Sequence, residues 1–235
     1  MRTFFPPPFA VSVLAAGALW TVARPAAART TAPPLLRVKL SLRVARCPPA
    51  AVKGKRTSGA HRAPVKPKAW VDAQLAAARK LLAPYRIALV ARRSSFTPRR
   101  CELDTRAQRH ALAEHASSIG AVNVLVVRRV RDLDVRSYNL MGVHWRYRGG
   151  RKAWRGRRFV ILTARAKAGV LAHELCHFFG LKHDPKGGNL MAPGPSSPLR
   201  RRRPRPKPWK PRLERWQARR LRAAIGRFTR SRSGH

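Results

Sequence analysis

Acidic residues are scarce in this chain. Its 235 residues hold 9 Asp plus Glu against 52 Lys plus Arg, which gives a formal net charge of +43. So few carboxylates leave little from which to build calcium sites, and Asp132 and Asp134 are the one candidate pair. A turn at the end of a strand explains that pair better, so we expect no calcium.

Because of the excess of positive charge, the surface of the protein attracts anions. Such a field attracts nucleic acid, anionic cell-wall polymers or lipid headgroups, so nonspecific polyanion contacts with the cell envelope or nucleic acid are expected. Arg200 to Lys210 concentrates the charge in RRRRPRPKPWK, whose prolines exclude a helix. No recognisable nucleic-acid module accompanies the charge.

Long apolar runs are absent except near the start of the chain. Residues 4 to 23 are mostly apolar, follow Arg2 and precede Ala26-Ala27-Ala28, a small-residue cleavage signature. We predict a signal peptide over residues 1–28, with an uncleaved anchor as the alternative. The functional part is therefore expected to be secreted or periplasmic, with no transmembrane span in the mature chain.

The rest of the chain, in a sequence that is 44% hydrophobic, suits one globular domain with tails. Period-two and helical patterns alternate along it, and a Pro-, Lys- and Arg-rich loop separates the first two elements at 48–67. The predicted strands are 36–44, 87–90, 122–130, 142–147 and 158–163. The predicted helices are 68–84, 105–117, about 166–179, and 212–228. This order indicates an α+β fold with a mixed, twisted sheet of about five strands.

Cysteine is rare, with three in the chain, so an exported protein can form one disulfide and keep one thiol. Cys47 follows the first predicted strand and Cys101 follows the second. Two parallel strands of a strand-helix-strand unit lie side by side with those ends together, so we pair Cys47 with Cys101. Cys176, inside a predicted helix, is expected to pack against the sheet as a small buried thiol.

The most informative segment is residues 173–184, HELCHFFGLKHD, which contains the pattern H-E-x-x-H-x-x-G-x-x-H. A helix turns about 100° per residue, so His173 and His177 project from one face and can bind the same ion. Glu174 stands one step round the helix, close enough to hold a zinc-bound water without binding the metal.

The same pattern supplies a third ligand. Gly180 can adopt the left-handed conformation that ends a helix, which lets the chain double back and deliver His183. Three protein ligands leave the fourth tetrahedral position open, as in a catalytic zinc site and unlike a structural one. We therefore predict one catalytic Zn²⁺ bound by His173, His177 and His183, with Glu174 as the catalytic base.

Downstream, a turn-rich loop leads to Asn189-Leu190-Met191-Ala192-Pro193. Together with the zinc pattern, this methionine resembles the metzincin metallopeptidases, whose histidines are followed by a tight turn with a methionine beneath the metal. The resemblance implies that Met191 is this Met-turn residue and that the fold is a metzincin-like catalytic domain with a C-terminal helix. It also implies that strand 142–147 is the sheet edge above the cleft, where a peptide substrate adds antiparallel.

The position within the metzincins stays open. Asp184 after the third histidine is similar to the adamalysin/reprolysin group, whereas the turn itself resembles that of the matrixins. Asp184 is assigned to supporting the ligands or positioning their loop, with a solvated charge as the alternative. Pro193 stands where some relatives carry a tyrosine ligand. Arg46-Cys47-Pro48 faintly resembles the cysteine switch of matrixin propeptides, but its place after the first core strand favours the disulfide.

We therefore expect a secreted zinc metalloendopeptidase that acts on protein or peptide substrates as a monomer. The rival hypothesis is an exported polyanion-binding protein with a vestigial or structural zinc site. The predicted organisation is a signal peptide at 1–28, a peptidase domain at 29–199, a basic linker at 200–211, the C-terminal helix of the domain at 212–228, and a basic tail at 229–235.

Overall fold

The computed structural model describes residues 33–49, 61–135, 137–184, 188–193 and 211–231. The predicted signal peptide lies outside the described residues, as do nearly all of the basic linker and most of the basic tail. Within the described ranges, no helix has both the length and the apolar composition needed to cross a membrane.

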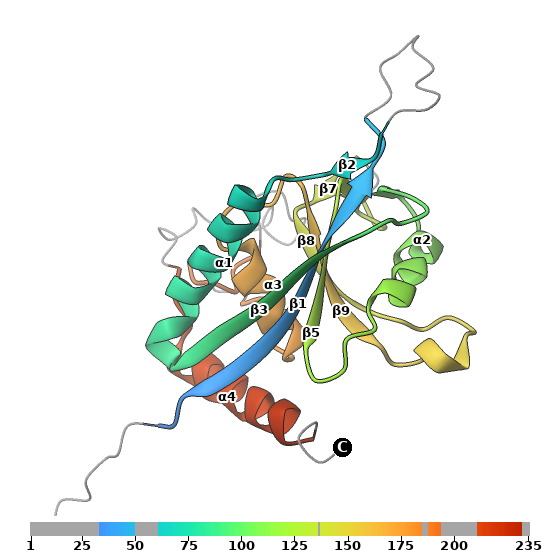
Figure 1. The fold of residues 1–235 in the computed structure, drawn as a ribbon. Helices are drawn as coiled ribbons and strands as arrows, with labels where there is room; N and C mark the ends of the chain where they lie inside the picture. The colour runs from blue at the N-terminus through green and yellow to red at the C-terminus, as the bar shows by residue number, and fades with distance from the viewer. Residues whose placement is uncertain (1–32, 50–60, 136, 185–187, 194–210, 232–235) are drawn as a thin grey trace, which may run out of the picture. The chain divides into compact units, whose positions relative to one another are not determined.

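Two sheets hold the described strands, and Figure 1 shows the strands of the main sheet. The strands of the main sheet are β1 (Leu36–Cys47), β2 (Ala63–Pro64), β3 (Ile87–Phe96), β5 (Val122–Val127), β8 (Gly142–Arg146) and β9 (Arg158–Thr163). A smaller sheet joins β4 (Glu102–Leu103), β6 (Arg129–Arg131) and β7 (Asn139–Leu140). In the main sheet β3, β1, β5, β9 and β8 are hydrogen-bonded in that order, and β2 pairs with the last residues of β1.

The main sheet is mixed, as predicted. β3, β1, β5 and β9 run parallel, and β8 is antiparallel to β9. Among the described strands, β8 pairs with β9 alone and so forms an edge of the sheet, which confirms the edge position expected for this strand. The five predicted strands are all present, and β2 is an addition inside the segment that we had expected to be a loop.

Helices lie along the sheet as the sequence order requires. They are α1 (Lys68–Leu82), α2 (Arg106–Ala111), α3 (Val170–Phe178) and α4 (Arg215–Arg230), with short 3-10 segments at Ala83–Tyr85, Leu112–His115 and Lys152–Trp154. Buried residues of α1, α3 and α4 share one core with the sheet, whereas the segment after α2 belongs to a second core on the opposite face.

Strand alternation divides the sheet between these two cores. In β5, Val122, Val124 and Val126 join the core with α1, α3 and α4, while Leu125 and Val127 join the other. Successive side chains of a strand point to opposite faces, so a strand covered on both sides is mostly apolar. All six residues of β5 are accordingly buried.

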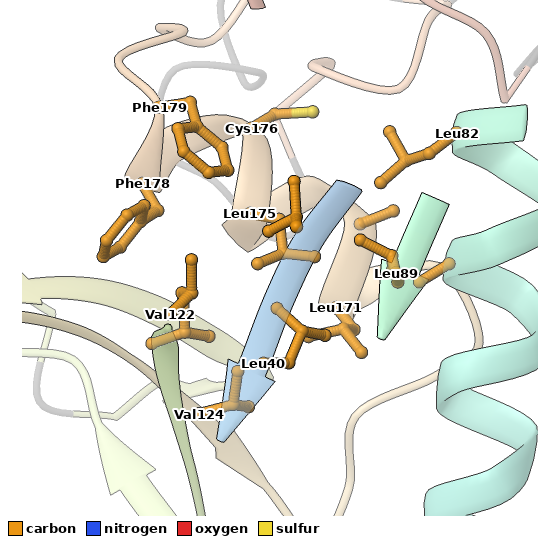
Figure 2. Packing of buried hydrophobic residues seen from close by; sticks show 14 of the residues in the cluster. Leu40, Leu82, Leu89, Val122, Val124, Leu171, Leu175, Cys176, Phe178 and Phe179 are labelled. Atoms are coloured by element: carbon orange, nitrogen blue, oxygen red, sulfur yellow. The ribbon is translucent and has the colours of Figure 1, made fainter. Parts of the chain in front are cut away.

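The core beneath α3 fixes the position of that helix. Figure 2 shows Leu171 and Leu175 of α3 packed beside Leu40 of β1 and Val124 of β5. Full burial of each such side chain contributes about 1.5–3 kcal/mol to stability. The helix therefore has one face in the core, and its remaining residues are available for other contacts.

Two predicted elements extend less far than expected. The strand predicted at 122–130 breaks at Arg128, because the N–H groups of Arg128 and Arg129 donate to the carbonyl of Cys101 and turn the chain into the second sheet. The helix predicted at 105–117 becomes α2 followed by a 3-10 segment. A capping box between Thr105 and Gln108 starts α2 at the predicted place.

The helix of the zinc motif also begins later than predicted. Two turns precede it, in which Ala166 N donates to Thr163 O and Val170 N donates to Lys167 O, so regular helix starts at Val170 and not near Ala166. The C-terminal helix is displaced towards the end of the chain by a few residues relative to 212–228. Both changes leave the motif residues in their expected elements.

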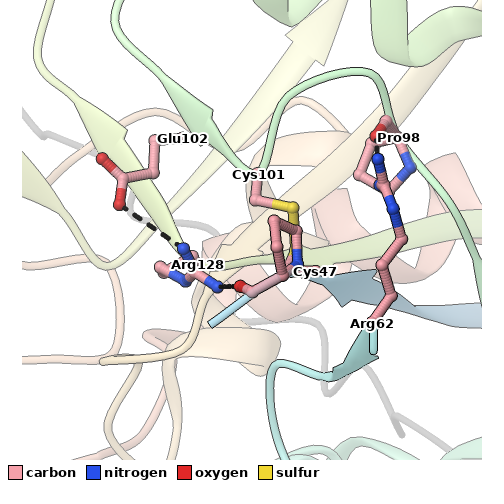
Figure 3. Close-up of a disulfide and its surroundings, with 7 residues drawn as sticks. Cys47, Arg62, Pro98, Cys101, Glu102 and Arg128 are labelled. Atoms are coloured by element: carbon pink, nitrogen blue, oxygen red, sulfur yellow. Dashed lines mark hydrogen bonds and ion pairs between the residues drawn. A yellow bond between two sulfur atoms is a disulfide. The ribbon is translucent and has the colours of Figure 1, made fainter. Parts of the chain in front are cut away.

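A disulfide joins Cys47 and Cys101, as predicted from the parallel arrangement of β1 and β3 (Figure 3). The alternative use of Cys47 as a latency switch is therefore wrong, because its sulfur is bonded to Cys101. The bond closes a loop with a sequence separation of 54 residues. Chain-entropy arguments give such a cross-link about 4 kcal/mol of stabilisation.

Asp132 and Asp134 form the predicted turn. The Oδ1 atom of Asp132 accepts hydrogen bonds from the N–H groups of Asp134 and Val135 at 2.8 and 3.2 Å. A carboxylate that accepts from the backbone two and three residues ahead stabilises a turn directly after β6. The local hydrogen bonds account for this acidic pair.

Candidate metal centre

Helix α3 presents two histidines on one face. His173 and His177 lie four residues apart, and their ring centroids are 4.5 Å from each other. On the core side of the helix, Cys176 is fully buried and forms no disulfide, as predicted. Burial raises the pKa of its thiol to about 12, so Cys176 is a neutral packing group and not a thiolate ligand.

The end of α3 returns the chain towards these histidines. Gly180 has a φ of +91°, its N–H donates to His177 O at 2.9 Å, and Leu181 N donates to Cys176 O at 3.0 Å. This pair of bonds is a Schellman motif, which a residue without a Cβ closes at low cost. Three residues after Gly180, His183 comes back to the helix.

The three histidines converge through one nitrogen each. The Nε2 atoms lie 3.0 Å apart between His173 and His177, 3.2 Å between His177 and His183, and 3.3 Å between His173 and His183. Their candidate ligand atoms all lie within 4.8 Å of one another. We call these three side chains the metal centre.

Backbone carbonyls set the ring orientation. His173 Nδ1 lies 2.7 Å from Leu190 O, and His177 Nδ1 lies 2.7 Å from Leu181 O. A carbonyl can only accept, so each Nδ1 carries a proton and each neutral ring keeps its lone pair on Nε2. Lone pairs that face each other at about 3 Å repel unless a cation lies between them.

The arrangement fits a zinc ion. With Zn–N bonds of 2.0–2.1 Å and tetrahedral angles, two imidazole nitrogens stand ~3.3 Å apart, close to the separations found. Burial lowers the pKa of all three histidines, that of His177 to about 3, so the rings are neutral and available to a metal at pH 7. The residues present can therefore hold a metal ion, with zinc as the best match.

The turn after the metal centre is tied to it by the backbone. Ala192 N donates to Asn189 O at 3.0 Å, which closes a tight turn with the buried Met191 inside it. Leu190 of the same turn supplies the carbonyl that orients His173. Met191 is fully buried, in the core that also contains residues of α3.

Asp184 is buried between that turn and α4. Its Oδ2 atom accepts from Asn189 Nδ2 and, at 3.4 Å, from Gln217 Nε2, and its N–H donates to Met191 O at 2.8 Å. Asn189 Oδ1 in turn accepts from Met191 N. Of the two alternatives left by the sequence, loop positioning matches these contacts, whereas a solvated charge does not, because Asp184 is only 7% exposed.

The side chain of Glu174 lies against the edge strand β8. A Cβ placed on Gly142 would lie 2.7 Å from Glu174 Cγ and 3.0 Å from Glu174 Oε1, so only glycine permits this approach. The carboxylate also accepts a hydrogen bond from the backbone N–H of His144. Burial raises the pKa of Glu174 to about 8, and the His144 N–H acts in the opposite direction.

The register of β8 explains why that N–H is available. Met141 O accepts from Thr163 N and Tyr147 N donates to Arg157 O, so odd-numbered residues of the strand bond to β9. The backbone groups of Gly142 and His144 therefore point away from β9, to the free edge. Glu174 meets β8 at this edge.

Sequence reasoning identified the three histidines, Glu174 and Asp184, and the structure brings all of them to one region. It missed Gly142 and His144, whose contacts depend on how α3 lies across the edge strand. It also missed the roles of Asn189 and Gln217. Gln217 did carry a signal, since it is a polar residue within the apolar stripe of α4 and is completely buried.

Comparison with known proteins finds similar solved structures but no matching family model or curated sequence. No protein-family model matches the chain, and no curated protein matches its sequence. Among solved structures, a metalloproteinase-II from Bacteroides fragilis is similar, with a TM-score of 0.49 and 13% sequence identity. The match covers 81% of this chain and 53% of that chain, so this chain spans about half the length of that protein.

Proposed function

We propose that the chain is a secreted zinc-dependent endopeptidase of the metzincin type, with Glu174 as general base. One observation carries the proposal: three neutral histidine Nε2 atoms converge at 3.0–3.3 Å, with Glu174 next to the first of them. Of the described residues, the metal centre contains three potential ligands, and a structural zinc site would use four. An open position beside a carboxylate suits hydrolysis.

When bound, zinc would supply Lewis-acid activation of water and of the scissile carbonyl. Glu174 takes the proton of the attacking water and later returns it to the leaving amine, a contribution typically worth about 10²–10⁴ in rate. The raised pKa of its carboxyl suits a group that must both accept and donate a proton near neutral pH.

The free edge of β8 orients the substrate in this proposal. An extended peptide can pair antiparallel with the outward backbone groups of Gly142 and His144, as a strand adds to a sheet edge. Because Glu174 lies against the same two residues, the paired peptide and the base meet at one place. The outward N–H of His144 is a candidate donor to the developing oxyanion once the carboxylate turns to the water.

Export and a monomeric state complete the proposal. The Cys47–Cys101 disulfide is typical of proteins that work in an oxidising compartment. The apolar segment near the start of the sequence supports a signal peptide. The rival function, polyanion binding with a structural or vestigial zinc site, is supported by the net charge of +43.

One experiment separates the two functions. The mature protein and Glu174→Gln are compared for zinc content and for cleavage of a mixed peptide library. We expect equal zinc content, efficient cleavage by the unaltered protein, and a loss of at least about 10²-fold in the variant. Cleavage that is unchanged in the variant contradicts the role of Glu174. A zinc-loaded protein that cleaves nothing, yet binds DNA or anionic glycans tightly at low salt, favours the rival.

A further inference from the structure

A concave site lies at the disulfide, away from the metal centre in the chain. It is a pocket of ≈ 230 Å³ lined by residues that follow β1, precede β2, and flank β4 and β6. We call it the arginine pocket, and its lining is Pro48, Arg62, Arg99, Arg100, Cys101, Glu102 and Arg128. No residue of the metal centre belongs to it.

The pocket has an uncompensated positive charge. Four guanidinium groups line it together with one carboxylate, that of Glu102. That carboxylate is already bound by Arg129, and Arg128 lies 4.0 Å from it. The next acid along the chain, Asp104, is paired with Arg129 and Arg131. The nearby acids are thus engaged with arginines of the small sheet, and the pocket keeps most of its charge for a ligand.

Two of the arginines are held in place by the backbone. Arg128 donates to the carbonyl of Pro48, and Arg62 Nη1 donates to the carbonyl of Pro98 at 3.4 Å (Figure 3). The Cys47–Cys101 disulfide ties together the chain segments that carry these carbonyls. Arginines fixed before a ligand arrives lose less conformational entropy on binding, so the site is partly preorganised.

The other two arginines are free to close on a ligand. Arg99 and Arg100 are exposed neighbours at the rim of the pocket, in the connection between β3 and β4. Arginine forms paired, charge-assisted hydrogen bonds with tetrahedral oxyanions, and it does so better than lysine because its donors form a rigid fork. Four such forks around one concavity suit a compact anion with several oxygens.

We infer that the arginine pocket is a binding site for a phosphate group carried by an ester. The pocket is smaller than the ~300–1,000 Å³ of sites for drug-sized ligands, so it accommodates the phosphate and its nearest carbons and not a whole polymer unit. The phosphate can come from a free monoester or from a phosphate-bearing polymer of the cell envelope. This inference does not depend on the peptidase activity.

The test measures binding of glycerol 3-phosphate to the full-length, disulfide-bonded protein by titration calorimetry at fixed ionic strength. Arg99→Ala/Arg100→Ala removes two rim arginines, and Arg219→Ala/Arg220→Ala removes two exposed arginines of α4 as a matched control. We expect saturable binding at one site, a loss of at least about tenfold in the pocket variant, and less than about twofold in the control. Thermal unfolding of both variants checks that they fold.

Three outcomes overturn the inference. The first is an absence of saturable binding by the unaltered protein to both glycerol 3-phosphate and poly(glycerol phosphate). The second is an equal loss of affinity in the pocket and control variants, because the binding would then depend on the overall positive charge of the protein and not on the pocket. The third is unchanged affinity in Arg99→Lys/Arg100→Lys, because charge without the guanidinium fork would then be sufficient.

Two further ligands identify the source of the phosphate. If poly(glycerol phosphate) binds more tightly than the monoester, and if its binding depends on Arg99 and Arg100 in the same way, the ligand of the pocket is a polymer. Stronger binding of the monoester assigns the pocket to a small molecule. Dextran sulfate is the second ligand. If it binds as tightly as the phosphate ligands and depends equally on Arg99 and Arg100, the pocket prefers oxyanions in general, which contradicts the inference.

Discussion

The metal centre and the arginine pocket differ in what holds their side chains. In the metal centre, backbone carbonyls at 2.7 Å orient the rings of His173 and His177, and the helix that carries both rings is packed in the core. In the arginine pocket, arginine side chains donate hydrogen bonds to backbone carbonyls. The segments that carry these carbonyls are held together by a disulfide and not by core packing. The metal centre therefore depends on exact placement of its rings, whereas the arginine pocket depends on the number of charges that a ligand meets.

The largest expected effect comes from removing a ligand of the metal centre. His177→Ala should lose stoichiometric zinc and at least about a thousandfold of any peptidase activity, because the ion contributes several kcal/mol to hydrolysis. Metal analysis and peptide cleavage measure both quantities. His61→Ala, which changes an exposed histidine, is the control and should retain both. Zinc retained in His177→Ala at full stoichiometry would exclude our ligand set.

Gly142→Ala separates placement of the base from metal binding. The added methyl group would lie 2.7 Å from Glu174 Cγ, so the carboxylate must move. A displacement of this size at a catalytic group costs about 10–10²-fold in kcat/KM, with zinc content unchanged. Gly150→Ala is matched to it, since a Cβ there meets no atom within 4 Å. Equal activity of the two variants would show that Gly142 does not position Glu174.

Removal of the disulfide should affect the two sites unequally. Cys47→Ser/Cys101→Ser is expected to lower the free energy of unfolding by about 4 kcal/mol, measured by chemical denaturation. Under native conditions the folded fraction should keep its zinc affinity, because no ligand lies near the bond in the chain. Phosphate binding should weaken, since the bond joins two walls of the arginine pocket. A parallel loss at both sites would remove the distinction between them.

Asp184→Ala tests whether the loop supports the metal centre. The change removes the acceptor for Asn189 and Gln217, both of which are buried. Loss of such a supporting contact typically lowers metal affinity by about 10–100-fold. Competition with a zinc chelator measures the affinity. Asp134→Ala, at an exposed position in the turn after β6, serves as an acidic control and should leave it unchanged.

A pH dependence is expected for the zinc-free protein. Burial holds the pKa of Glu174 at about 8, above its unfolded value of 4.5, so between these values the folded state retains a proton that the unfolded state has lost. This term lowers stability as pH rises, and Glu174→Gln removes it. The stability of the variant relative to the unaltered protein should therefore increase from pH 5 to pH 8, measured by denaturation in chelator. If the difference in the free energy of unfolding between the two proteins stays constant from pH 5 to pH 8, the pKa of Glu174 is not raised by burial.

The histidines act in the opposite direction. The folded-state pKa of His177 is about 3 and that of His144 about 4, both below the ordinary histidine value of 6.5, chiefly because of burial. As pH falls below about 6.5 the unfolded state gains protons that the folded state does not, so stability decreases. This contribution is common to the unaltered protein and to Glu174→Gln, and it cancels in their difference.

Local sequence predicted what local geometry controls. The spacing of His173 and His177 on one helical turn, and the glycine that ends α3, are consequences of bonds within eleven residues of chain. The disulfide followed from a simple rule for parallel strands, because β1 and β3 are joined by a single helix. The break after β5 was not predictable in this way, since it depends on the carbonyl of Cys101 in a distant segment.

By itself, the sequence determined the three converging histidines, the order of the main elements along the chain, the cysteine pair and the large positive charge, because each depends on residue types at short spacing or on simple counts. Only the tertiary structure decided that Glu174 lies against Gly142, that Gln217 and Asp184 meet in the interior, and that four arginines line one pocket. These contacts join segments up to tens of residues apart, and their distances are set by how helices pack on the sheet, which no local pattern encodes.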